Sequence, residues 1–292
     1  MNNLTVYVEH FKTFLDGQSK SAHTIKQYSL DSAQFIQFVK KNKLESITAE
    51  SIEQYKIQLQ ENYSSITTIN RKLASLKSFV HFLQSRNIMK PVDDQLFLPL
   101  ENSKNELNVL TNKQIRQALQ IWFTVYETVD EVEVQWMALR NYTIMRIISE
   151  LGIKPSEVVR MKWSHINSES IRIISKQSYR DLPVSKELLR WLDLYKLSTE
   201  EVLPIAQQID YIWLGLGNKQ GEPISVKTIE RLFKHVSIMV GYKVTCTNVR
   251  YFAIQEDMQK QDNTDLDLLF EKYGYARKSV LKERALRMEG DA

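Results

Sequence analysis

The sequence predicts a mainly α-helical protein that carries one small antiparallel β-sheet. Apolar residues recur with the helical period of about 3.6 residues over most of the chain. Only one central region, residues 171–184, alternates apolar and polar residues as a strand does. Glycine is scarce, with 8 residues in 292, against a usual frequency of about 7%. So few glycines are typical of a helix-rich fold with few tight turns.

Four amphipathic helices are predicted within residues 1–88. They begin near Thr5, after Ser21, at Thr48 and near Thr67. Serine and threonine are favoured at helix N-termini because the side-chain oxygen accepts a hydrogen bond from a free backbone N–H. Since each of these helices has one apolar stripe, we expect the four to pack together as a separate domain.

Segment 89–110 breaks the helical pattern and is predicted to be an interdomain linker. Pro91 and Pro99 bracket a stretch rich in aspartate that has no period, and proline disfavours helix in the residue before it. Helical periodicity resumes at Thr111. The second predicted domain therefore covers residues 111–292.

The predicted sheet lies inside this second domain. Ile171 and Ile173 alternate with polar residues, and residues 182–184 form a plausible partner strand after a short turn. A further short strand is expected at residues 211–214. The long helix before the sheet ends at Gly152, since glycine readily adopts the left-handed conformation that closes helices.

Composition excludes several classes of protein. Hydrophobic residues make up 43% and charged residues 25% of the chain, which are ordinary globular values. No apolar run approaches the roughly 18 residues that span a bilayer, and the N-terminus does not resemble a secretory signal. The single cysteine, Cys246, fits a reducing cytoplasm. We therefore expect a cytoplasmic protein that does not associate with membranes.

No metal or cofactor site is predicted. The five histidines are scattered and have no partner at metal-ligand spacing, so a zinc site is not expected. No glycine-rich phosphate loop is present either. The net charge of +4 permits nucleic-acid binding without requiring it.

The most informative motif lies in the last fifty residues. Residues 247–251 read Thr-Asn-Val-Arg-Tyr, Gly274 precedes Tyr275, and Arg284 follows nine residues later. This series resembles the catalytic tail of the tyrosine recombinase (phage integrase) family, which reads His-x-Leu-Arg-His, Leu-Gly-His and then a nucleophilic tyrosine. Arg250 is kept. The substituted positions are Thr247, Tyr251, Tyr275 and Arg284.

Other motifs extend the resemblance over nearly the whole chain. Residues 152–157 are similar to the block that bears the first catalytic arginine, with Lys154 in its place. Lys176 lies about where the catalytic lysine of the family's small sheet belongs. Residues 23–28 and 68–79 look like the second and fourth helices of the family's core-binding domain. The resemblance implies a four-helix core-binding (SAM-like) domain followed by a mostly helical catalytic-type domain.

The same resemblance implies binding of double-stranded DNA between the two domains. The cations at positions that face DNA in the family are Lys26, Arg71, Lys72, Lys77, Arg180, Lys227 and Arg231. On the fourth helix, Arg71 and Lys72 share the side opposite the apolar stripe with Ser75 and Ser78, which predicts an exposed basic side. The basic C-terminal segment, residues 277–292, has few aliphatic residues, so we expect a monomer in solution.

The substitutions predict that the family's chemistry is lost. Arg284 cannot attack a phosphate, and Thr247 and Tyr251 cannot transfer protons near neutral pH as histidine does. Lysine at 154 is also a poorer clamp for a phosphate than the two-pronged guanidinium of arginine. We therefore expect a DNA-binding regulatory or architectural relative that does not exchange strands, and that acts alone or with an active recombinase or another protein.

Two alternatives remain open at this stage. Tyr273 or Tyr275 could serve as a displaced nucleophile in an active site-specific recombinase. The chain could instead be a protein-binding scaffold that has lost DNA binding. The retained cations argue against the scaffold.

Overall fold

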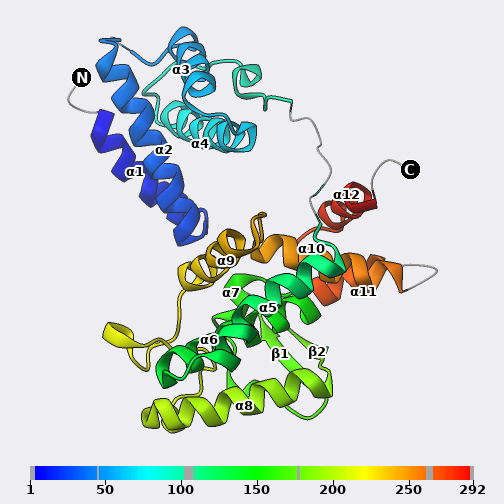
Figure 1. Ribbon diagram of the computed structural model, residues 1–292. Helices are drawn as coiled ribbons and strands as arrows, with labels where there is room; N and C mark the ends of the chain where they lie inside the picture. Colours follow the sequence, from blue (N-terminus) through cyan, green and yellow to red (C-terminus); the bar gives the residue numbers. More distant parts are fainter. Residues whose placement is uncertain are drawn as a thin grey trace. The chain divides into compact units, whose positions relative to one another are not determined.

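The structure is a computed structural model that describes residues 4–44, 46–101, 107, 109–175, 178–260 and 266–289. The chain divides into two compact units, Met1–Lys104 and Asn105–Ala292, both drawn in Figure 1. Their folds confirm the predicted mainly α class with one small antiparallel sheet.

The first unit is a bundle of four helices. They are α1 (Leu4–Gly17), α2 (Ala22–Lys41), α3 (Ala49–Asn62) and α4 (Ile66–Ser85). Ser21 caps α2 by accepting a hydrogen bond from the backbone of Thr24, and Thr48 caps α3 in the same way. The core is rich in aromatic residues, because Phe11 of α1 packs against Phe79 and Phe82 of α4.

The first unit extends beyond the predicted boundary at residue 88. A short 3₁₀ turn, η1 (Asp94–Phe97), buries Phe97 in the bundle core. The side chain of Asn70 on α4 both donates to the carbonyl oxygen of Leu100 and accepts from its backbone N–H. The first part of the predicted linker at 89–110 thus belongs to the bundle. Its lack of a helical period misled the prediction, since irregular chain can also pack.

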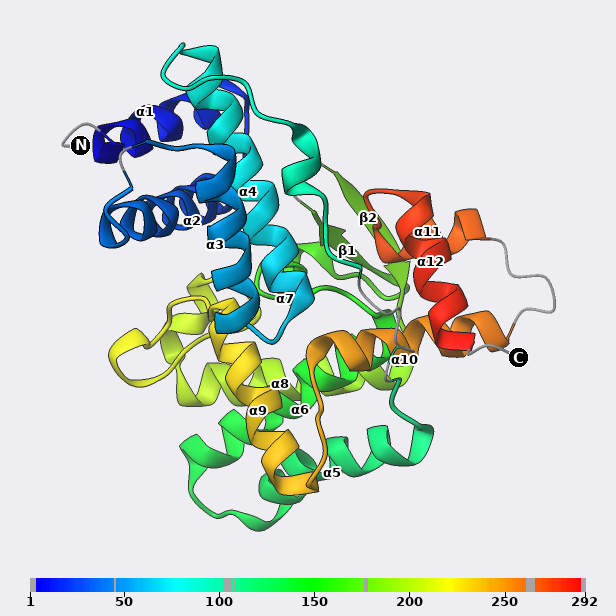
Figure 2. The same cartoon turned by 90° about the horizontal axis from the view of Figure 1, so that it is seen from above.

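The second unit is built around α6 (Val132–Leu151), which is buried along most of its length. The helices α5 (Asn112–Thr128), α8 (Lys186–Val202) and α10 (Cys246–Gln259) pack against it. The remaining helices are α7 (Pro155–Val158), α9 (Val226–Val240), α11 (Leu266–Tyr273) and α12 (Lys278–Glu289). Figures 1 and 2 show α8 and α9 at different faces of this unit.

The sheet pairs β1 (Ser170–Ile174) with β2 (Tyr179–Pro183) in an antiparallel hairpin, with Ile171 opposite Leu182. This confirms the predicted hairpin. The further strand expected at residues 211–214 is absent from the described chain, where Tyr211 and Leu214 form only isolated bridges, to Lys162 and Pro223. Each partner segment contributes a single bridge, and neither belongs to the hairpin of β1 and β2, so residues 211–214 do not extend the sheet.

The C-terminal segment docks on its own unit. In α12, Leu281, Ala285 and Met288 are buried. Leu281 and Met288 belong to a small core that also contains Tyr251 and Leu269. The carbonyl of Arg287 also accepts a hydrogen bond from the backbone of Leu107. These contacts place α11 and α12 beside the residues that the sequence singled out.

Across the described residues, no helix is both long and apolar enough to cross a membrane. The same residues contain no cluster of His, Cys, Asp or Glu side chains suited to a metal ion.

Candidate functional site

Three of the residues predicted from the motifs meet at the carboxyl end of α11. Lys154 comes from the turn before α7, Arg180 from β2 and Arg250 from α10. These cations surround the backbone of residues 272–274, named the carbonyl turn below. The structure therefore brings together side chains that lie nearly a hundred residues apart in sequence.

Each carbonyl oxygen of the carbonyl turn accepts a hydrogen bond from a different cation. Arg180 Nε lies 2.7 Å from the oxygen of Lys272, and Arg250 donates to that of Tyr273 at 2.6 Å. The Lys154 ammonium donates to the carbonyl of Gly274. The last carbonyls of a helix have no partner within it and carry a partial negative charge. The three cations satisfy and neutralise this helix end.

Gly274 fits this arrangement for a steric reason. Its φ of +56° lies in the left-handed region, and a Cβ atom built there would lie 2.8 Å from an Arg180 nitrogen. Any other residue would be strained and would displace the guanidinium. The glycine of the motif therefore allows Arg180 to reach the carbonyl turn.

A buried carboxylate, Glu157, organises the cations from the other side. It accepts two hydrogen bonds of 3.0 Å from Arg180, one of 3.0 Å from Ser175 and one of 2.8 Å from the backbone of Lys154. Burial raises the pKa of Glu157, but these bonds and the Arg180 charge outweigh it and hold the pKa below its usual value. Glu157 is therefore ionised at neutral pH.

The charge of Lys154 is less favoured than that of an ordinary lysine. Burial lowers the pKa of Lys154, Glu157 opposes this, and the charges of Arg250 and Arg180 lower it further. The side chain keeps 39% of its surface exposed. Lys154 is thus the cation of this cluster that lies nearest to solvent.

Arg250, the retained family arginine, is buried and has acceptors on two segments. One terminal nitrogen donates to the carbonyl of Gly152, and the other donates to that of Tyr273. Its guanidinium carbon lies 5.5 Å and 5.0 Å from the ring centroids of Tyr273 and Tyr275. Arg250 therefore ties the end of α6 to the end of α11.

The two tyrosines considered as displaced nucleophiles lie in this cluster, and neither is an exposed hydroxyl. Tyr273 is fully buried, and its hydroxyl lies 2.8 Å from the carbonyl of Ala253 and 2.7 Å from a carboxylate oxygen of Asp257. Burial, and then Asp257, raise the pKa of Tyr273. Burial also raises the pKa of Tyr275, although Arg250 opposes the shift.

The other substituted positions are divided between the cluster and its surroundings. On α12, the Arg284 guanidinium lies 5.4 Å from the ring centroid of the buried Tyr251, and burial followed by the charge of Arg250 lowers the pKa of Arg284. Thr247 is instead exposed in the first turn of α10. Lys176 lies outside the described residues.

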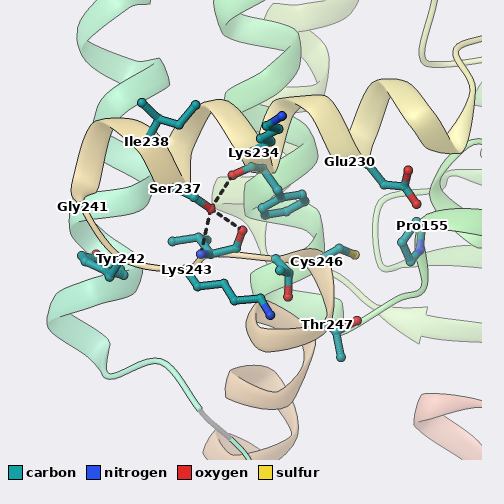
Figure 3. A pocket seen from close by; sticks show the side chains of 13 residues that line it. Pro155, Glu230, Lys234, Ser237, Ile238, Gly241, Tyr242, Lys243, Cys246 and Thr247 are labelled. Atoms are coloured by element: carbon teal, nitrogen blue, oxygen red, sulfur yellow. Dashed lines mark hydrogen bonds between the residues drawn. The ribbon is translucent and has the colours of Figure 1, made fainter. Parts of the chain in front are cut away.

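Thr247 borders a cavity of about 720 Å³ between α9 and the start of α10. Figure 3 shows Thr247 beside Cys246, with Lys243 and Lys234 around the same cavity. Pro155, next to Lys154, also lines the cavity. The cavity therefore adjoins the cation cluster without containing its polar groups.

The predicted DNA-contacting cations divide into exposed and engaged groups. Lys26 on α2 and Lys227 and Arg231 on α9 are exposed. Lys77 forms a 2.7 Å ion pair with Asp94. A DNA backbone can reach the exposed group directly, and it can also reach Arg71, whose side chain keeps 38% of its surface exposed.

Two of the expectations for cations must be corrected. Lys72 is buried and forms a 2.9 Å ion pair with Asp31, and Ser75 beside it is buried as well. The predicted basic side of the fourth helix is therefore partly a helix interface, because α2 packs on it. Arg180 likewise keeps only 13% of its side chain exposed, since Glu157 and the carbonyl turn hold it.

Sequence reasoning missed the carboxylates Asp31 and Asp257, and it assigned no role to Glu157, the last residue of the motif at 152–157. Asp31 carries a signal, because it lies three residues after Tyr28 and four before Phe35, on the inward side of an amphipathic helix. An acid at such a position needs a buried partner, and Lys72 provides it.

Removal of Arg250 is expected to loosen the C-terminal segment. Arg250→Ala leaves buried carbonyls on two segments without a donor, so the free energy of unfolding should fall by about 2–4 kcal/mol. Arg231→Ala removes an exposed arginine and should change it by less than about 0.5 kcal/mol. Thermal unfolding and amide exchange of α11 and α12 measure both effects. Unchanged exchange in Arg250→Ala would contradict the role described for this residue.

Alkaline pH is expected to destabilise the protein through Tyr273. The folded state holds this phenol neutral, whereas the unfolded chain loses the proton above a pH of about 10. Its contribution to stability is complete below that pH and falls by about 1.4 kcal/mol per pH unit above it. Denaturant unfolding from pH 8 to 11 should give a shallower decline for Tyr273→Phe than for the parent. Equal slopes would show that Tyr273 ionises freely in the fold.

Comparison with known proteins identifies relatives. Residues 8–87 match the family described as "Phage integrase, N-terminal SAM-like domain". Tyrosine recombinase XerA of Pyrococcus horikoshii is 24% identical over 94% of this chain and 86% of its own. Tyrosine recombinase XerC of Rickettsia felis is 28% identical over 66% of this chain and 67% of its own.

Solved structures share the fold. A lambda integrase dimer bound to a COC′ core site aligns with a TM-score of 0.70 at 14% identity, covering 99% of this chain and 78% of that one. XerH bound to a palindromic difH substrate, in a post-cleavage complex, aligns with a TM-score of 0.68 at 16% identity, covering 89% and 75%.

Proposed function

The chain belongs to the tyrosine recombinase family, and we propose that it binds double-stranded DNA without exchanging strands. In this proposal it is a cytoplasmic, monomeric, regulatory or architectural relative of the active recombinases. An active recombinase is the partner that such a role implies. No cofactor or metal is required.

One observation carries the proposal, which is that no tyrosine hydroxyl is available where the family's nucleophile belongs. Arg284 occupies that position, and an always-charged guanidinium has no lone pair to attack phosphorus. The neighbouring Tyr273 hydroxyl is buried between a carbonyl and a carboxylate. Without an oxygen nucleophile from the protein, the covalent phosphotyrosine route has no first step.

The state of the cation cluster supports the same conclusion. A transferring phosphate needs donors aimed at the position where its negative charge develops. Arg180, Arg250 and Lys154 instead donate to the carbonyl turn, and Arg180 also donates to Glu157. These donors already have acceptors within the protein. A phosphate would have to compete with the end of α11 for them.

DNA binding is supported by the relatives and by the exposed cations. XerH was solved bound to a difH substrate, and lambda integrase was solved bound to a COC′ core site. In this chain, Lys227 and Arg231 lie exposed one turn apart on α9. Exposed cations on one helix face neutralise phosphates and release counterions, which favours binding.

We expect no covalent adduct between the purified protein and DNA. Nicked suicide duplexes of pooled sequence, which trap the phosphotyrosine intermediate, should yield no band that survives denaturing detergent. An active tyrosine recombinase run in parallel provides the positive control. An adduct that disappears in Tyr273→Phe or Tyr275→Phe would refute the proposal and establish a displaced nucleophile.

We also expect duplex DNA to bind with a strong dependence on salt. The logarithm of the binding constant falls by about 0.9 for each phosphate contact per tenfold increase in salt. Lys227→Glu with Arg231→Glu should weaken binding about tenfold or more and reduce this slope. Lys186→Glu with Arg190→Glu reverses two exposed charges on α8 and serves as the matched control.

Fluorescence anisotropy across a salt series measures the affinity and the slope together. Equal effects from the two double variants would mean that only net charge matters. If the parent shows no salt-dependent binding, the scaffold alternative replaces the proposal.

A further inference from the structure

The first unit contains a buried charge cluster that joins α2 to α4. Asp31 of α2 keeps 4% of its side chain exposed and pairs with Arg71 and Lys72, which are consecutive residues of α4. Gln27, one turn earlier on α2, also donates to the carboxylate at 3.3 Å. One carboxylate therefore contacts two cations of α4, of which Arg71 is partly exposed and Lys72 is buried.

Lys72 is the inner cation of this cluster. Its side chain is 7% exposed, and its ammonium donates to Asp31 at 2.9 Å and to the Gln34 side chain at 2.6 Å. The Tyr63 ring covers the ammonium at 5.0 Å from the ring centroid, and Gln34 holds the Tyr63 hydroxyl at 3.1 Å. Lys72 is thus fully engaged inside the bundle and does not reach solvent.

Arg71 is the outer cation. Its side chain keeps 38% of its surface exposed, while both terminal nitrogens approach the Asp31 carboxylate. Arg71 also lies at one of the positions that the family resemblance implies for DNA contact. A guanidinium held in this way loses little side-chain entropy when it binds a phosphate.

The charges of the cluster explain why Asp31 does not simply neutralise Arg71. One carboxylate and two cations leave a net charge of about +1 on the cluster. Both cations contact Asp31, and one carboxylate compensates only one of their two positive charges. The positive charge of Arg71 therefore remains available to a ligand at the surface.

We propose that Asp31 and the buried Lys72 are positioning residues for DNA binding: Asp31 orients the Arg71 guanidinium toward a DNA phosphate, and Lys72 preserves its charge. This inference rests on the proposed DNA binding. It assigns an effect on DNA to a lysine that cannot touch DNA. It also makes the geometry of Arg71, and not its charge alone, the source of affinity.

The test compares single variants by anisotropy over a salt series, at a temperature where thermal unfolding shows each one folded. Arg71→Ala should weaken DNA binding about tenfold and lower the salt slope by about 0.9. Arg71→Lys should weaken binding nearly as much but keep the salt slope. Lysine retains the positive charge but lacks the planar guanidinium that can donate two parallel hydrogen bonds to a phosphate. Lys72→Met should weaken binding at least about threefold, since Arg71 must then neutralise Asp31.

A double-mutant cycle tests the role of Asp31. In the Asp31→Asn background, Arg71→Ala should cost no more than about twofold in affinity, because Arg71 is no longer oriented. Lys12→Met, which removes an exposed and carboxylate-paired charge from the same unit, is the control for net charge. The cycle still tests the inference if Lys72→Met does not fold.

The possible outcomes separate the inference from the proposed function. If the parent binds DNA and Arg71→Lys or Lys72→Met keeps the parent affinity, the inference is overturned and the cluster only stabilises the bundle. Equal costs of Arg71→Ala in both backgrounds overturn it as well. If the parent shows no salt-dependent binding, the proposed function fails first and the inference fails with it.

Discussion

The carboxyl end of α11 is held by three cationic side chains, and the shape of the second unit's C-terminal half depends on this interaction. Arg180, Arg250 and Lys154 approach from a strand, a helix and a turn, and each donates to one carbonyl of the turn. A helix terminus supplies a partial negative charge at a fixed point. It therefore adds a polar link between segments that already share the main hydrophobic core through Ile153, Leu182 and Val249.

Much of the fold could be predicted because its signals are local. The helical spacing of apolar residues and the N-terminal capping residues predicted the helices. The alternation of apolar and polar residues predicted the hairpin of β1 and β2. The segment around Phe97 could not be predicted, because a buried aromatic residue in irregular chain has no period. The burial of Lys72 was also missed, since a lysine beside an apolar stripe is exposed unless another helix brings a carboxylate to it.

For the site, motif spacing could predict which residues meet but not what they bind. Lys154, Arg250 and Tyr275 do lie in one cluster, as the resemblance implied. Whether a cation faces a ligand or a protein carbonyl depends on how the end of α11 approaches, which is a tertiary property. Glu157 shows the same limit, because its partner Arg180 lies 23 residues away on a strand.

The conformation of Gly274 also bears on how such a protein can evolve. Positions 274 and 180 constrain each other, because a side chain at 274 would occupy the space of the Arg180 guanidinium. A tyrosine placed at position 284 by a single substitution would leave all three cations bound to the turn. A substitution at position 274 is therefore tolerated only together with a smaller side chain at position 180.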